Sequence, residues 1–189
     1  MKNIFTQLHL CAIIVFAIGC SNSNKNGTIS GKLNNFNGEY VFLQQITETG
    51  DQNLDSSKVD KRGNFTLKNP AGETDYYILR TDSVNIIFLV LKAGESVTVD
   101  ADAKNLEASY KVKGSKDSDL LRILRSYDKT LSDSLNTLYV EIRNQNPVVA
   151  DSIGSYLQEY YAMTMEEFAK NFIRQNLNSI VSLSATKFV

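Results

Sequence analysis

Cys20 is the residue whose surroundings most clearly predict a chemical reaction. It follows Ala17-Ile18-Gly19 at the end of an apolar segment that starts at Leu8, and the polar residues 21–24 come directly after it. This arrangement is typical of a bacterial lipoprotein signal, in which a peptidase cuts before the cysteine, the thiol receives a diacylglyceryl group and the new amino terminus is acylated. We therefore interpret residues 1–19 as a lipoprotein signal peptide and Cys20 as the lipidation site.

The apolar segment before Cys20 has two alternative interpretations, a membrane-spanning helix and an ordinary secretory signal. A membrane-spanning helix needs about 20 apolar residues, and the run that ends before Gly19 is shorter, so cleavage is favoured over spanning. An ordinary secretory cleavage nearby stays open, because Ala17 stands where lipoprotein signals usually carry leucine. With either cleavage the protein is expected in the cell envelope. With lipidation, the membrane is its partner through Cys20, on the periplasmic face or in the outer membrane.

The residues on which most enzymes rely are missing after Cys20. The chain has one histidine, His9, and one other cysteine, Cys11, and both lie in the predicted signal peptide. A Ser-His-Asp relay, a Cys-x-x-Cys redox pair and the preferred ligands of zinc are therefore excluded. We expect no enzymatic activity, no metal and no cofactor. The net charge of −1 also argues against a nucleic-acid partner, which usually requires a basic surface.

Residues 20–27 are polar and are predicted to form a flexible tether. Residues 28–114 then show short alternating or apolar runs separated by glycine, asparagine and aspartate, which is the pattern of β-strands. The strands are predicted at 28–33, 40–44, 54–59, 64–67, 76–80, 86–91, 96–100 and 109–113. About eight short strands indicate an antiparallel β-sandwich or open barrel.

Two features of this β domain are predicted in more detail. Residues 60–63, Asp-Lys-Arg-Gly, form a turn in which Gly63 can take a positive φ, and we expect it to join two strands of a β-hairpin. The run 86–91 is apolar on both faces, which is typical of a central strand that is covered on each side.

Residues 115–189 are predicted to form a helical segment, which makes the fold class α+β. An apolar stripe at steps of three and four predicts a helix over 118–144, and Pro147 suits the first turn of a second helix that ends near 176. A short third helix is predicted over 180–189. The predicted stripes contain Leu120, Leu124, Tyr127, Leu131, Leu135, Leu138 and Ile142 in the first helix, Ile153, Leu157, Tyr160, Thr164, Phe168 and Phe172 in the second, and Ile180, Leu183 and Phe188 in the third.

Several segments, taken in order, resemble an uncharacterised N-terminal β domain family. They are residues 54–65 (LDSSKVDKRGNF), 88–99 (FLVLKAGESVTV), 112–115 (VKGS) and 172–179 (FIRQNLNS), with Leu177 where that family usually has proline. Its members are typically lipoproteins of Gram-negative bacteria, in which this domain precedes a thioredoxin-like domain of the thiol-disulfide interchange or peroxiredoxin-related type. The resemblance implies a thioredoxin-like protein or domain as partner, but no catalytic residue can be carried over because Trp-Cys-x-x-Cys is absent.

Few other residues suggest a site. Asp82-Ser83-Val84 and two similar triplets at 133–135 and 151–153 resemble the acceptor pattern of bacterial O-glycosylation, and only Ser83 is predicted in a turn, so it is the candidate acceptor. Chance and the preference of Asp and Ser for helix starts are the alternative explanation. Tyrosines 76, 77, 156, 160 and 161 could form a sugar- or peptide-binding platform, but core packing is the favoured interpretation.

These observations lead to two functional expectations. The first is a non-catalytic, lipid-anchored accessory or binding domain of the kind that precedes a thioredoxin-like thiol-disulfide oxidoreductase in the cell envelope. The alternative is a stand-alone surface lipoprotein that binds glycans or peptides through an exposed sheet face.

Overall fold

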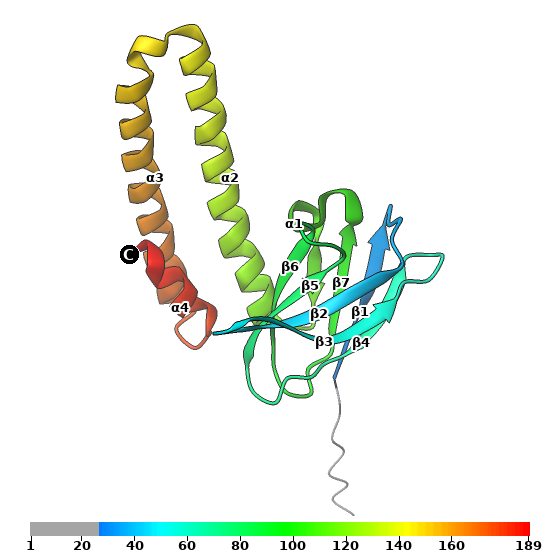
Figure 1. The fold of residues 1–189 in the computed structure, drawn as a ribbon. Coiled ribbons are helices and arrows are strands. Elements are labelled where there is room, and N and C mark those ends of the chain that lie inside the picture. Colours follow the sequence, from blue (N-terminus) through cyan, green and yellow to red (C-terminus); the bar gives the residue numbers. More distant parts are fainter. Residues whose placement is uncertain (1–26) are drawn as a thin grey trace, which may run out of the picture.

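The computed structural model describes residues 27–189, which form a two-sheet β-sandwich followed by a long helical hairpin (Figure 1). The predicted α+β fold is confirmed, and the sheets stay open as a sandwich. The signal peptide and nearly all of the tether lie outside the described residues. The strands are β1 (Thr28–Asn34), β2 (Tyr40–Thr47), β3 (Gly50–Lys58), β4 (Asn64–Lys68), β5 (Asp75–Arg80), β6 (Ile86–Leu91), β7 (Val97–Asp102) and β8 (Lys111–Lys113). The helices are η1 (Ala103–Asn105), α1 (Leu106–Ser109), α2 (Lys116–Gln145), α3 (Pro147–Gln175), α4 (Val181–Ala185) and η2 (Thr186–Phe188).

The two sheets have the strand orders β4-β1-β7-β8 and β3-β2-β5-β6. Neighbouring strands are antiparallel, as predicted, except for β1 and β7, which are parallel. The backbones of this parallel pair approach closely at Gly31, where an added Cβ would lie 1.7 Å from the carbonyl oxygen of Val99. Glycine is therefore required at this position by the close contact.

The turn predicted at residues 60–63 is present, but the hairpin predicted around it is wrong. Gly63 has φ of 87°, and the Asp60 carboxylate accepts the backbone N–H groups of Arg62 and Asn64, each at 2.8 Å. The turn nevertheless connects β3 of one sheet to β4 of the other. Alternation along a strand reports which side chains face inward, and it does not report which strand is the neighbour.

Side chains of β3 explain how the chain crosses between the sheets at this corner. Ser57 Oγ accepts the backbone N–H of Thr66 at 3.3 Å, and Asp55 accepts that of Lys68 at 3.2 Å. In a paired strand, backbone carbonyls would accept these two N–H groups; here the side chains of Ser57 and Asp55 accept them. The tight hairpin of this sheet is instead β2–β3, in which Thr47 pairs with Gly50.

The main core lies between the two sheets and contains the inward-facing residues of each strand, such as Ile29, Leu43, Leu79, Leu89 and Val99. A second, smaller core lies on the other side of the β3-β2-β5-β6 sheet, where the helices pack. Its fully buried members include Val90 of β6, Ala169 of α3 and Val181 of α4. The helical segment is thus fixed to the sandwich through the outer face of one sheet.

Strand β6 is covered on both faces, as its apolar pattern predicted, but it is an edge strand and not a central one. Its free edge is closed by two serines at the start of α2. Ser118 Oγ accepts the backbone N–H of Val90 at 2.9 Å and donates to its carbonyl at 2.8 Å, and Ser115 Oγ donates to the same carbonyl at 2.9 Å. Ser115 is also the N-cap of α2. These bonds give the edge its missing partners.

Helices α2 and α3 confirm the predicted lengths, and α3 begins at Pro147 as expected. The stripe of α3 differs from the prediction, because Tyr160 is exposed whereas Tyr161 is half-buried against α2. The buried residues Met165 and Ala169 also lie outside the predicted positions. In the tail, the buried residues are Val181 and Ala185, and the predicted Leu183 is exposed. The tail has a partner that the sequence did not reveal, namely the second core beside the sheet.

Candidate functional site

The outer face of the β3-β2-β5-β6 sheet carries the features that most resemble a binding site. Strand pairing places Gln44, Ile78 and Phe88 in one row across it, and Phe42, Arg80 and Ile86 in the next. Helix α2 leaves the sandwich beside β6, so that the hairpin and the sandwich form the two arms of a V (Figure 1). The face is therefore covered near the base of α2, while Tyr40 and Ile46 remain partly exposed.

Three polar groups at this face are buried without a hydrogen-bond partner in the described part of the chain. They are Gln44 Oε1, Arg80 Nε and Arg125 Nε, the last on α2. The guanidinium of Arg125 lies 3.9 Å from the ring centroid of Phe88, directly over this face. Because a buried group without a partner costs about 1 to 3 kcal/mol, these three atoms mark this face as a place where polar bonding within the described residues is incomplete.

A pocket of about 340 Å³ opens where this face meets the helices. Its lining is mostly apolar and contains two cationic groups, Arg125 and Lys187, and one carboxylate, Asp128. The pocket residues come from β2, β5, β6, α2, α4 and η2: Ile46, Tyr76, Phe88, Leu121, Leu124, Arg125, Asp128, Leu183, Ser184, Lys187 and Phe188. Such a mixture of apolar walls with a few charged groups is typical of a binding pocket.

The C-terminal tail forms one wall of the pocket and is tied to the sheet by Tyr76. The Tyr76 hydroxyl donates to the carbonyl of Ile180 at 3.1 Å and lies 2.7 Å from Ser184 Oγ. Burial raises the pKa of Tyr76, so the phenol stays protonated at neutral pH. The pocket therefore has a fixed shape that depends on contacts between residues about one hundred positions apart.

A polar cluster at the base of α2 fixes the helix against both the sheet and the tail. Asp117 accepts from Lys92 Nζ at 2.8 Å and from Ser179 Oγ at 2.6 Å, and its side chain is almost completely buried. Burial alone would raise the pKa of Asp117, but the hydrogen bonds from Lys92 and Ser179 lower it below its usual value. The carboxylate is thus charged and fully paired, and it has a structural role.

The charges around the pocket are only partly neutralised. Arg125 pairs with Glu107 at 2.7 Å, and Asp128 accepts the Tyr161 hydroxyl at 2.6 Å. Burial and the Asp128 carboxylate raise the pKa of Tyr161 to about 12. Within residues 27–189, Arg80 and Lys187 have no carboxylate at ion-pair distance. The pocket and the adjoining sheet face therefore favour an acidic partner with an apolar side chain to insert.

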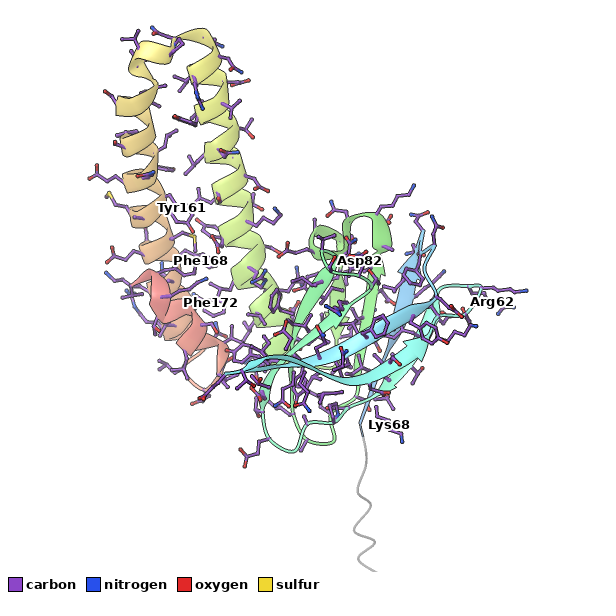
Figure 2. All side chains as sticks on the ribbon, viewed as in Figure 1. Arg62, Lys68, Asp82, Tyr161, Phe168 and Phe172 are labelled. Carbon is purple, nitrogen blue, oxygen red and sulfur yellow. The ribbon has the colours of Figure 1, made fainter. Side chains whose placement is uncertain are left out.

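The predicted site residues lie away from this pocket. Cys20 is outside the described residues. Ser83 is exposed in the β5–β6 turn, where the Asp82 carboxylate accepts the N–H groups of Val84 and Asn85, so the exposure expected of a glycosylation acceptor is present (Figure 2). Hydrogen bonds from Asn85 lower the pKa of Asp82. The serines of the other two triplets lie within α2 and α3.

The tyrosines do not share one face. Tyr77 points into the main core and Tyr76 supports the tail, as core packing predicted, whereas Tyr156 and Tyr160 are 64% and 48% exposed on α3. The sequence interpretation missed Arg80 and Arg125. Arg80 continues the outward alternation of Tyr76 and Ile78, and this signal could have placed it on the outer face.

Other kinds of site are not indicated in the part of the chain that the structure describes. Residues 27–189 contain no group of three or more histidine, cysteine, aspartate or glutamate side chains arranged to hold a metal ion. Among these residues no helix combines the length and the apolar character needed to cross a bilayer.

The fold and the pocket define an α+β protein in which a β-sandwich carries a helical arm. The chain belongs to the family of a domain of unknown function, DUF4369, whose model matches residues 27–121, just over half of the chain. The expected membership of an uncharacterised N-terminal domain family is thereby confirmed. The match includes all eight strands and the Ser115–Ser118 junction with β6. Comparison with curated proteins found no match.

Proposed function

We propose that this protein is a lipid-anchored, non-catalytic binding domain of the cell envelope that holds a thioredoxin-like protein or domain. The lipid anchor is supported by the signal-like pattern before Cys20, and the redox partner by the sequence resemblance described above. The absence of any histidine or cysteine after position 20 supports a role in binding. The observation that carries the proposal is the pocket between the sheet and the tail, where Lys187 has no carboxylate at ion-pair distance within residues 27–189.

The arrangement of the sandwich and the hairpin suggests how the protein is oriented relative to the membrane. Strand β1 begins at the end of the sandwich opposite to the turn between α2 and α3 (Figure 1). A chain anchored in front of β1 would therefore hold its hairpin tip away from the membrane and leave the pocket open at the side. A partner on the membrane surface or just above it can reach the pocket in this arrangement.

Binding of a purified thioredoxin-like oxidoreductase from the envelope of the same organism tests the proposal. We expect the Lys187→Glu variant of the full chain to bind about tenfold more weakly, because reversing a charge at the mouth of the pocket repels an acidic partner. The matched Lys61→Glu variant changes an exposed lysine in the β3–β4 turn and should bind like the wild type. No binding to the wild type, or equal loss in both variants, would contradict the proposal.

A further inference from the structure

A cavity larger than this pocket lies elsewhere, between the two helices of the hairpin. It is a groove of about 740 Å³, within the range typical of small-molecule sites. One wall is a single face of α2 and the other a single face of α3, since the lining positions repeat at steps of three and four. The lining residues are Ser132, Leu135, Asn136 and Tyr139 of α2, and Gly154, Ser155, Leu157, Gln158 and Tyr161 of α3.

The groove interrupts the apolar packing expected between paired helices. Near the sandwich the hairpin is closed by aromatic contacts, with the rings of Tyr127 and Phe168 stacked at 3.8 Å, and Tyr161, Phe168 and Phe172 all lie on the side of α3 that faces α2 (Figure 2). Near the tip, Ala150 is buried again. Between these closed ends the groove is lined by hydroxyl and amide groups beside Leu135 and Leu157, so polar side chains lie next to the apolar ones that helix pairs normally bury.

The lining combines polar and apolar side chains and contains no charged one. Asn136 and Gln158 offer amide donors and acceptors from opposite walls, and neither has a hydrogen-bond partner within the described residues. Tyr139 lies against Gly154, where an added Cβ would be 3.2 Å from its ring. Tyr161 is held by its bond to Asp128, and its pKa of about 12 keeps the phenol neutral. Both aromatic rings are therefore positioned at the groove wall.

We propose that this groove binds a neutral carbohydrate. Sugar hydroxyls require donors and acceptors together, which amides and hydroxyls provide, and the apolar faces of sugar rings pack on aromatic side chains. An anionic or cationic ligand would leave its charge without a partner, because no side chain that is charged at neutral pH lines the groove. The site is separate from the pocket at the sheet, so it does not depend on the function proposed above.

A glycan array that carries neutral oligosaccharides, with uronic-acid and sulfated glycans beside them, tests this site on the full chain in detergent. We expect at least one neutral glycan to bind, and the Asn136→Ala/Gln158→Ala variant to lose about tenfold or more in affinity, since two hydrogen bonds are removed. The matched Asn144→Ala/Gln145→Ala variant changes two exposed amides of α2 outside the groove and should bind like the wild type.

The possible outcomes separate clearly. Loss in the groove variant alone, with circular dichroism unchanged in both, supports the site, and the Lys187→Glu variant should retain glycan binding. The proposal is overturned if no neutral glycan binds, if acidic glycans bind better, or if the groove variant binds as well as the matched control.

Discussion

Replacing Ser118 with alanine removes the hydroxyl that pairs both backbone groups of Val90 at the edge of the sheet. The N–H of Val90 loses its partner, whereas the carbonyl keeps Ser115. Orphaning a buried N–H costs about 1 to 3 kcal/mol, and the lost second bond about 1 kcal/mol more. Alanine regains about 0.5 kcal/mol through its helix propensity. We therefore expect the free energy of unfolding to fall by about 1.5 to 3.5 kcal/mol.

Urea unfolding followed by far-UV circular dichroism measures this change, and thermal unfolding should show a midpoint lower by about 3 to 14 °C. The matched Ser126→Ala variant changes an exposed serine of the same helix and should be as stable as the wild type or slightly more stable. If Ser118→Ala stays within about 0.5 kcal/mol of Ser126→Ala, the junction does not depend on these bonds and our account of the β6 edge is refuted.

Four further outcomes are expected. Asp117→Asn should reduce the loss of stability in acid. The pKa of Asp117 is lowered in the folded state, so its contribution to stability is complete above pH 3.8 and is lost as the pH falls through the folded-state pKa. Urea titrations from neutral to acid pH check this. Tyr161 has a pKa raised to about 12, so its contribution to stability is complete below pH 10 and declines as the pH rises towards 12. In a titration followed by tyrosinate absorbance, Tyr161→Phe should therefore remove a step at high pH. Gly63→Ala places a Cβ 2.3 Å from a carbonyl at positive φ and should destabilise by more than about 1 kcal/mol, whereas Gly72→Ala, with open space around it, should not. Cys20→Ser should abolish incorporation of an alkyne-labelled fatty acid and move the protein from the membrane to the soluble fraction; continued labelling would rule out Cys20 as the anchor.

Local features of this fold could be predicted well because they depend on local chemistry. The positions of the eight strands, the turn at Gly63 and the start of α3 at Pro147 all follow from periodicity, turn residues and helix signals. Strand partners could not be predicted in the same way. The placing of β3 and β4 in different sheets depends on long-range pairing, and the side-chain bonds from Asp55 and Ser57 leave no periodic signal.

The candidate sites were harder to predict than the fold. The pocket joins Ile46, Phe88 and Lys187, which are far apart in sequence and belong to different elements. No motif connects them, because their proximity is created by the tail folding back onto the sheet. The groove between the helices is encoded more locally, since Asn136 and Gln158 directly follow Leu135 and Leu157 of the predicted stripes.

Site-specific photo-crosslinking in intact cells tests the central claim most directly. A benzophenone side chain at Leu183, which is 71% exposed at the mouth of the pocket, is compared with one at Val148, which is 90% exposed at the hairpin tip. We predict that Leu183 crosslinks to a thioredoxin-like protein and that Val148 does not. Crosslinking of that protein from both positions alike, or from neither, would contradict the pocket as the binding site.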